Sequence, residues 1–499
     1  MTDFSVTTTL PPVKTVLDSG GGGLVTYPSY DRTALTRAVV HLGVGGFHRS
    51  HQAVYFDDLA ASGASGWGIV GVGIRRRRLG RVLREQDNLY SVVERDAHGS
   101  TARVIGSMLE YLLLADSPAT VRARLRDPRT KLVTLTITAD GYRLPGSLTD
   151  ADPRRWIFPL LLDALDVRRR AGVRPFTVLS CDNLPDNGGA ARRAVTDLAA
   201  QRSAALSAWV DRHVSFPNSM VDRITPATSR ADRKQVAREF GLRDACPVIT
   251  EPFSQWVIED QFSNVRPPLE TVGAIFVTDV RPYKLIKSRL LNGCHSALGY
   301  VGVLAGYRRA DEAMGDVAIK AMMTRMMREE VGPLLPSGVP GMDLDEYQRT
   351  LLDRLANPAI GDPLSRLCAR GSTKMVDYVL PTLQEASLGR RPRRLLTLVV
   401  AAWLRYLRGT DLRGARIELE DARADELRAR AWAGQGSPRH LLRLHDIFGD
   451  LSHDKDFCAD VEDLTRLLDL RGVAGAIAAV LDGAATHGSQ GPRRSSSYA

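Results

Sequence analysis

The sequence has few cysteines and no long hydrophobic run. Its five cysteines lie far apart, and no two form a CxxC pair: Cys181, Cys246, Cys294, Cys368 and Cys458. This distribution argues against a disulfide framework or a zinc knuckle and favours a reducing compartment, so we expect a cytoplasmic protein. No run of about 18 apolar residues predicts a membrane span. Residues Met1 to Leu10 also lack the basic and apolar regions of a secretory signal.

A large excess of one charge is lacking as well. The 67 lysines and arginines exceed the 57 aspartates and glutamates by 10, and the arginines are spread along the whole chain. A basic chain can bind nucleic acid, but aromatic residues do not alternate with the basic ones here. We therefore expect a small-molecule substrate and no specific nucleic-acid or membrane partner.

Short apolar runs alternate with longer charged segments from Ala38 to about residue 284. Several of these runs are rich in β-branched residues and nearly continuous, which is typical of strands buried on both faces of a parallel sheet. The runs are Val39–Leu42, Gly68–Ile74, Leu132–Ile137, Phe176–Leu179 and Val272–Val277. Beyond residue 284 the pattern predicts helices, at Ala318–Glu330, Leu344–Leu355, Arg391–Leu407 and Asp425–Ala433.

The chain is therefore expected to have an α/β Rossmann-type domain followed by an all-α domain. We predict an irregular N-terminal arm over residues 1–36, because Pro11, Pro12 and the run Gly20 to Gly23 disfavour regular structure. A dinucleotide-binding domain over 37–284 and a helical substrate-binding domain over 285–483 follow. The Gly-, Ser- and Arg-rich segment 484–499 is expected to be a disordered tail.

A glycine-rich turn follows the first predicted strand. Gly43, Gly45, Gly46 and Phe47 stand in a GxGxx pattern, with His48 where the usual dinucleotide fingerprint has Gly or Ala. Gly43 would allow a tight turn, and Gly45 would let the backbone approach a pyrophosphate. The turn therefore predicts NAD or NADP as cofactor. The alternative is an ordinary strand–helix turn.

The second predicted strand ends in four arginines, Arg75 to Arg78. NAD enzymes usually have an acid there, which binds the ribose hydroxyls, whereas an arginine favours the 2′-phosphate of NADP. We predict Arg75 as a cofactor contact and leave NAD and NADP both open. The alternatives are a solvated basic loop and, less favoured, a nucleic-acid patch.

Three polar residues of different chemistry share a predicted helix over Lys287–His295. At about 100° per residue, Asn292 lies about 140° and His295 about 80° around the helix from Lys287. A desolvated lysine can act as a base toward an alcohol, an asparagine amide can stabilise the developing oxyanion, and a histidine can orient the hydroxyl. The alternative is a surface helix with ordinary polar residues.

From about residue 38 to 480 the chain resembles the polyol-specific long-chain dehydrogenases of the mannitol 2-dehydrogenase family. The resemblance is carried by the Lys287-x4-Asn292-x2-His295 pattern and by motifs at Gly43–Gln52, Gln86–Tyr90, Thr134–Thr138, Ser180–Leu184, Phe216–Arg223 and Thr250–Phe253. It implies a monomeric, metal-independent enzyme that oxidises a sugar alcohol such as D-mannitol to the ketose D-fructose. His48 and His51 fit that expectation, because no Cys or Glu stands near them at ligand spacing.

The resemblance also implies a role for each candidate site residue. Lys287 would be the general base in oxidation, Asn183 and Asn292 would form the oxyanion hole, and His295 would bind substrate hydroxyls. Substrate contacts would come from Asp222, Arg366 and Lys374. The alternatives are a structural salt bridge between Asp222 and an arginine such as Arg223, and a solvated face for Arg366 and Lys374.

Two features depart from the family pattern. Lys284 follows Tyr283 where family members often have an acid, and the arginines after the second strand put the common NAD preference in doubt. A hexuronate reductase acting on fructuronate or tagaturonate is therefore an alternative, because Lys284 could bind a substrate carboxylate. A nucleotide-binding protein without turnover is a further alternative, which the intact Lys287, Asn292 and His295 disfavour.

Overall fold

The computed structural model describes residues 25–75, 77–143 and 153–487. It divides into two compact units, unit 1 (Met1–Arg281) and unit 2 (Pro282–Ala499), close to the predicted border at residue 284. Pro11, Pro12 and the run Gly20 to Gly23, which led us to predict an irregular arm, lie outside the described residues. The described part of that arm contains a short strand, β1 (Val25–Thr26), which the sequence pattern did not predict.

Unit 1 is built around a five-stranded sheet in which every neighbouring pair is parallel. The order β6-β3-β2-β7-β8 is that of a Rossmann half, and it reverses direction between β2 and β7. Four of these strands coincide with predicted apolar runs, and β6 was missed. The strands are β2 (Arg37–Leu42), β3 (Gly68–Gly73), β6 (Met108–Leu113), β7 (Leu132–Leu135) and β8 (Thr177–Ser180).

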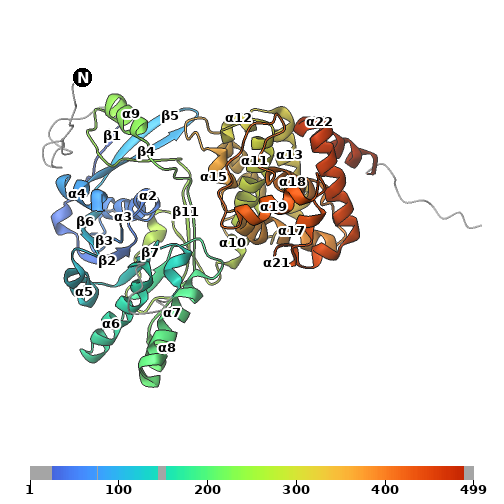
Figure 1. Ribbon diagram of the computed structural model, residues 1–499. Helices are drawn as coiled ribbons and strands as arrows, with labels where there is room; N and C mark the ends of the chain where they lie inside the picture. The colour runs from blue at the N-terminus through green and yellow to red at the C-terminus, as the bar shows by residue number, and fades with distance from the viewer. Residues whose placement is uncertain (1–24, 76, 144–152, 488–499) are drawn as a thin grey trace, which may run out of the picture. The chain divides into compact units, whose positions relative to one another are not determined.

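Helices cover both faces of this sheet (Figure 1). Because side chains alternate along a strand, Val40 and Leu42 pack in one core cluster and Val39 in the other. The first cluster includes side chains of α5 (Pro118–Arg126), α6 (Ile157–Arg170) and α7 (Asn187–Arg202), and the second includes those of α3 (Gln52–Ala61). Because both faces of the sheet are covered, a ligand can reach it only at the ends of its strands.

Two smaller sheets complete unit 1, and of their strands the sequence pattern predicted only the one within Val272–Val277. One has the order β1-β5-β4-β10, and the other has the order β12-β11-β9. Their strands are short or carry charged residues, which hides the alternation of hydrophobic residues. They are β4 (Tyr90–Asp96), β5 (Gly99–Ile105), β9 (Ser219–Asp222), β10 (Val248–Thr250), β11 (Gln255–Glu259) and β12 (Ile275–Val277). The predicted strand Val272–Val277 shortens to β12, because Gly273 adopts φ 92° and follows a 3-10 turn.

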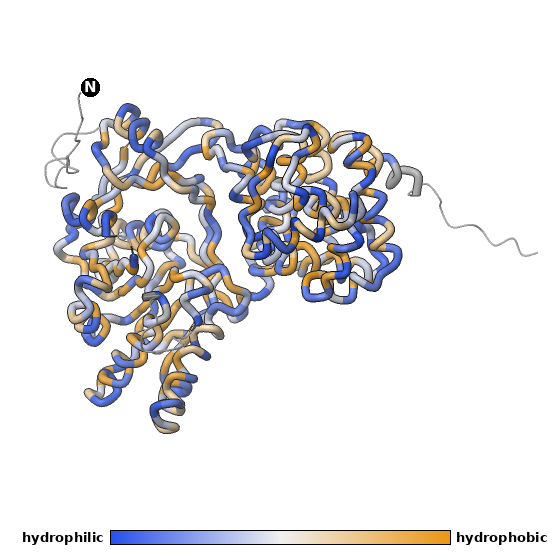
Figure 2. The backbone as a smooth tube through the Cα atoms, viewed as in Figure 1, coloured by the Kyte–Doolittle hydropathy of each residue, from blue (hydrophilic) through white to orange (hydrophobic). Residues whose placement is uncertain are grey.

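In the described part of unit 2, every element is a helix or a helical turn. The predicted helix Leu344–Leu355 is confirmed as α14, whereas Ala318–Glu330 divides into α13 (Val317–Arg325) and a π-turn, η6 (Met326–Val331). Hydrophobic and hydrophilic stretches alternate along these helices (Figure 2), as expected for helices with one buried face. None of the described helices is long and apolar enough to cross a bilayer.

Five further helices of unit 2 bear on the site or on the predicted boundaries. Short helices α15 (Leu364–Cys368) and α16 (Gly371–Lys374) pack near α11 (Gly293–Leu304), and α18 (Arg394–Tyr406) is buried from Leu395 onwards. The last helix, α22 (Lys455–His487), continues past residue 484, where we predicted the disordered tail to begin. The remainder of that predicted tail lies outside the described residues.

Candidate active site

The glycine-rich turn lies at the point where the strand order reverses. Gly43 follows β2 with φ +104°, and a Cβ there would lie 2.2 Å from the Thr136 carbonyl oxygen, so only glycine fits. By contrast, a Cβ at Gly45 or Gly46 would have no neighbour closer than 3.8 Å. The turn is therefore tight on the side of β7 and open at Gly45 and Gly46, as a backbone that approaches a dinucleotide requires.

The histidines around this turn contact other protein groups. His41 bonds through its two ring nitrogens to Thr134 Oγ1 (2.8 Å) and Thr136 Oγ1 (2.9 Å), and the His48 ring stacks on it with centroids 3.4 Å apart. Burial lowers the pKa of His41 to about 3 and that of His48 well below its usual value. His51 Nε2 donates to the Gln255 carbonyl at 2.9 Å. The neutral rings of His41 and His48 and the hydrogen-bonded ring of His51 therefore support the turn.

A cavity of about 650 Å³ opens beside the turn. Gly46 and Phe47 line it, together with Arg77 and Arg78 at the start of α4 (Arg77–Glu85). Arg75 is exposed and does not belong to the lining, and Arg76 lies outside the described residues. Of the predicted arginine run, Arg77 and Arg78 are thus the members that face the cavity.

The loop after β8 carries the first candidate oxyanion residue. Asn183 is exposed and follows Asp182, whose carboxylate accepts the backbone N–H groups of Ile137 (3.0 Å) and Thr138 (2.7 Å). Buried Asn187 donates from Nδ2 to three carbonyls, those of Ser180 (3.2 Å), Asp182 (2.9 Å) and Ser219 (2.8 Å). Asp182 and Asn187 therefore hold the loop of Asn183 to the ends of β7 and β9.

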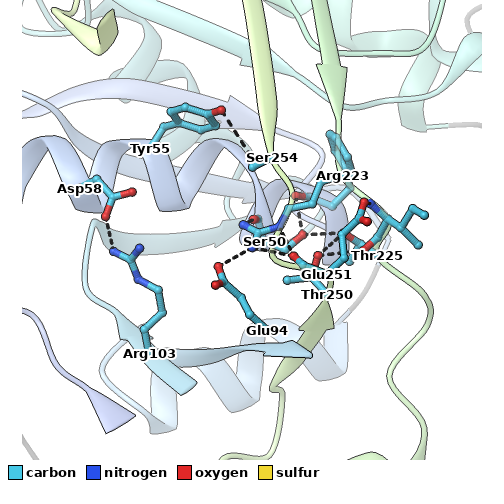
Figure 3. Close-up of polar contacts among 12 residues, drawn as sticks. Ser50, Tyr55, Asp58, Glu94, Arg103, Arg223, Thr225, Thr250, Glu251 and Ser254 are labelled. Carbon is cyan, nitrogen blue, oxygen red and sulfur yellow. Dashed lines mark hydrogen bonds and ion pairs between the residues drawn. The ribbon is translucent and has the colours of Figure 1, made fainter. Parts of the chain in front are cut away.

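Asp222 is the last residue of β9 and is buried. The neighbouring Arg223 forms an ion pair with Glu94. Arg223 also donates to the carbonyls of Ser50 (2.6 Å) and Glu251 (3.0 Å), as Figure 3 shows. The arginine thus ties β9 to the end of α2 (Gly46–Ser50) and to the segment after β10.

In unit 2 the predicted helix over 287–295 contains a π-turn. Lys287 ends α10 (Arg281–Lys287), Ser288–Asn292 form the π-turn η5, and α11 begins at Gly293. A π-turn bonds residue i to i+5, so residues five apart lie nearly above one another. Lys287 and Asn292 are five apart, and the turn brings them onto one side of the helix. The separation of about 140° that we expected assumes a regular α-helix, which the π-turn interrupts.

His295 lies in α11, within reach of several cations of unit 2. Burial lowers its pKa well below the usual value, and the positive charges of Arg366, Lys374, Arg354 and Lys287 lower it further. The imidazole is therefore neutral near pH 7. Its Nε2 is buried and has no hydrogen-bond partner among the described residues. A buried polar atom without a partner is costly, and it marks a place where a ligand group can bind.

Two of the cations near His295 are the predicted Arg366 and Lys374. Arg366 forms a bidentate pair with Asp362 through Nε (2.6 Å) and Nη2. Lys374 Nζ donates to the carbonyls of Arg366 (3.1 Å) and Leu367 (3.0 Å). Burial and the Arg366 charge lower the pKa of Lys374 to about 8.

Another π-turn, η8 (Met375–Val379), directly follows Lys374 and packs against η5. A Cβ at Gly293 would lie 3.8 Å from the Tyr378 carbonyl oxygen, which shows how closely the two turns approach. Each candidate lysine therefore precedes a π-turn, and the two turns pack together. The sequence analysis missed both turns, since no residue pattern distinguishes them from α-helix.

The structure thus brings Lys287, His295, Arg366 and Lys374 together in unit 2, with Asn292 beside Lys287. In unit 1 it gathers the glycine turn, Asn183 and Asp222 at strand ends. Sequence analysis missed Asn187 and the role of Arg223, although both lie in or next to motifs that it listed. Buried Cys294 keeps its proton, because burial raises its pKa to about 12, and burial also raises the pKa of Cys181. Both therefore act as packing residues.

Two family models together match most of the chain. The mannitol dehydrogenase Rossmann domain matches residues 37–271, and the mannitol dehydrogenase C-terminal domain matches residues 279–468. The mannitol 2-dehydrogenase of Emericella nidulans is 41% identical over 494 residues, which cover 93% of this chain and 98% of the relative. That of Aspergillus fumigatus is 43% identical over 467 residues, which cover 89% of this chain and 93% of the relative.

Solved structures agree. Pseudomonas fluorescens mannitol 2-dehydrogenase, in a ternary complex with NAD and D-mannitol, matches with a TM-score of 0.82 and 39% identity, over 92% of this chain and 97% of that chain. A D-sorbitol dehydrogenase in substrate-free form matches with a TM-score of 0.84 and 33% identity, over 93% of this chain and 99% of that chain. The predicted fold class and family resemblance are confirmed. The chain belongs to the mannitol dehydrogenase family.

Proposed function

We propose that the protein is an NAD(P)-dependent polyol dehydrogenase that interconverts D-mannitol and D-fructose without a metal. Family membership supports the reaction class, and the P. fluorescens relative was solved with NAD and D-mannitol. The observation that carries the proposal is the grouping of Lys287, Asn292 and neutral His295 around one π-turn. Base, oxyanion donor and hydroxyl ligand are the groups that alcohol oxidation needs.

Lys287 removes the proton of the reacting hydroxyl in oxidation and returns it to the ketose oxygen in reduction. Asn292 and Asn183 donate amide N–H groups to the oxygen as negative charge develops on it. The unpartnered Nε2 of His295 supplies a hydrogen bond to a substrate hydroxyl. Asp222, Arg366 and Lys374 bind the rest of the polyol chain.

The residues of the glycine turn fit a dinucleotide. Gly43 is required by its φ of +104° and its contact with Thr136, and Gly45, Gly46 and Phe47 border open space. A nicotinamide cofactor held by these residues would supply hydride transfer from and to the carbinol carbon. The turn holds the backbone where a pyrophosphate can approach it closely.

The contacts of the cations favour a neutral polyol over a hexuronate. Arg366 is already neutralised by Asp362, and two N–H groups of Lys374 Nζ donate hydrogen bonds to backbone carbonyls. Paired groups of this kind can exchange hydrogen bonds with hydroxyls, whereas a carboxylate is bound best by an uncommitted cation.

The test is ketose reduction, followed by the absorbance of the reduced nicotinamide, with D-fructose and with fructuronate and tagaturonate as alternatives. We expect fructose to react and Lys287→Ala to lower turnover about 10²-fold or more, as loss of a positioned acid–base group does. Lys320→Ala is the matched control, because Lys320 is an exposed lysine of α13. Turnover of Lys287→Ala at the control rate would refute the assignment, and reaction only with hexuronates would refute the substrate.

We also propose that the enzyme is cytoplasmic and monomeric. All five cysteines are free, which suits a reducing cytoplasm. The family resemblance supports a monomer, and light scattering at working concentration tests it: a stable dimer would contradict this part of the proposal.

A further inference from the structure

The cavity beside the glycine turn has an unusual charge. Its lining includes four arginines, Arg49, Arg77, Arg78 and Arg233, and none of the described residues that line it is an aspartate or a glutamate. The arginines come from three different elements, α2, α4 and α9 (Arg230–Phe240). The concentration of positive charge therefore results from the tertiary structure and not from the arginine run alone.

The four arginines differ in what they already bind. Arg49 is buried and committed, because its guanidinium donates to the carbonyls of Gly45 (3.2 Å) and Cys246 and lies over the Tyr90 ring. Arg77 has one exposed ion pair, at 3.3 Å from Asp116. Such exposed pairs contribute little and exchange easily.

Arg78 and Arg233 have no ion pair with any residue that the structure describes, whereas Arg77 and Arg223 do. Arg78 is exposed at the cavity rim, and Arg233 is half-buried. Cations that face one cavity without a carboxylate repel each other, and an anion placed between them removes that repulsion. The guanidinium group is suited to phosphate, which it binds through two parallel N–H groups.

The place of the cavity identifies the anion. Gly46 and Phe47 belong to the turn that would hold the pyrophosphate, and Arg77 and Arg78 follow the carboxyl end of β3. In Rossmann domains, this strand end lies beside the adenosine ribose, and an acid there binds the 2′-hydroxyl of NAD. Here no acid is present from Ile74 to Arg78. A 2′-phosphate would lie where the cations are.

We propose that Arg78 and Arg233, with Arg77, bind the 2′-phosphate of NADP(H), and that this enzyme prefers NADP(H) to NAD(H). The inference rests on the proposed function only for the class of cofactor, since it concerns the adenosine end and not the reacting end. Arg75 is excluded from the site because it does not line the cavity. The preference is opposite to the one expected from the relative solved with NAD.

Calorimetric titration of the full chain with 2′,5′-ADP and with ADP tests the inference without turnover. The two probes differ in whether the 2′-phosphate is present. We expect 2′,5′-ADP to bind at least about tenfold more tightly, since one charge-assisted hydrogen bond already accounts for such a factor. The advantage should shrink at high salt, because exposed cations are screened. Equal affinity for the two probes would overturn the inference.

Variants separate the named arginines from general charge. Arg78→Ala and Arg233→Ala should each reduce the affinity for 2′,5′-ADP about tenfold and leave that for ADP unchanged, which also shows that the variants are folded. Arg81→Ala is the matched control: Arg81 belongs to the same helix, pairs with Glu85 and does not line the cavity. If Arg81→Ala loses as much affinity as Arg78→Ala, the effect is long-range charge and the assignment is wrong.

The outcome is independent of the substrate. A chain that prefers 2′,5′-ADP but does not reduce fructose would keep this inference and refute the proposed function. A chain that reduces fructose but binds both probes equally would support the proposed function and refute this inference.

Discussion

Glu330 is a buried carboxylate that caps the most buried helix of unit 2. It is 5% exposed, and its two oxygens accept the backbone N–H groups of Leu395 and Leu396, each at 2.8 Å. These N–H groups lie in the first turn of α18, where a helix lacks internal acceptors. Burial raises the pKa of Glu330 from 4.5 to about 7, although the two hydrogen bonds act in the opposite direction.

This pKa makes stability depend on pH with a defined sign. Between pH 4.5 and about 7 the native carboxyl holds a proton that the unfolded chain has already lost, so the free energy of unfolding falls as the pH rises through this window. The difference between the two pKa values corresponds to about 3 kcal/mol. The contribution is complete below pH 4.5 and absent above about pH 7.

Glu330→Gln removes the titration and keeps one acceptor oxygen. We expect the wild-type protein to lose about 3 kcal/mol of unfolding free energy relative to this variant between pH 4.5 and 7. Denaturant unfolding of both proteins at several pH values, followed by far-UV circular dichroism, measures the difference. Glu346→Gln is the control, because Glu346 is an exposed glutamate of another helix of unit 2, α14. A wild-type-minus-variant difference that stays constant with pH would refute the reasoning.

Two further predictions concern the site. Gly43→Ala should destabilise the protein by about 1–3 kcal/mol and weaken cofactor binding, because the new Cβ would clash with the Thr136 carbonyl and the residue would have an unfavourable φ. The control is Gly63→Ala, because Gly63 has a similar φ of +99° and a Cβ there would have no neighbour within 4 Å. Thermal unfolding and cofactor titration of both variants measure the two effects. Equal loss in both variants would mean that backbone strain alone matters. Lys374→Met should raise the KM for mannitol about tenfold. In the wild type we expect the KM to increase above pH 8, where the Lys374 ammonium loses its proton, and the variant should lack this increase. A variant in which the KM still increases above pH 8 would exclude Lys374 as the source of the effect.

The sequence by itself determined the class of fold and most of the candidate residues. Nearly continuous apolar runs such as Val39–Leu42 are typical of strands buried on both faces, so they predicted the parallel sheet that the structure has. Gly43 likewise predicted a tight turn, and its φ of 104° agrees with that prediction. The motifs carried the family resemblance, because several of them occur in the right order along the chain.

The tertiary structure alone decided how the candidate residues are oriented and which of them carry uncompensated charge. A π-turn depends on packing between segments, here η5 against η8, so no spacing rule could place Asn292 relative to Lys287. The pKa of His295 is likewise lowered by burial, and then further by cations that are up to 79 residues away in the sequence, as Lys374 is. Arg233 joins the arginines of α4 around one cavity only after folding. The charge state and the orientation of a side chain depend on residues that are close in space, and a local sequence pattern does not specify those residues.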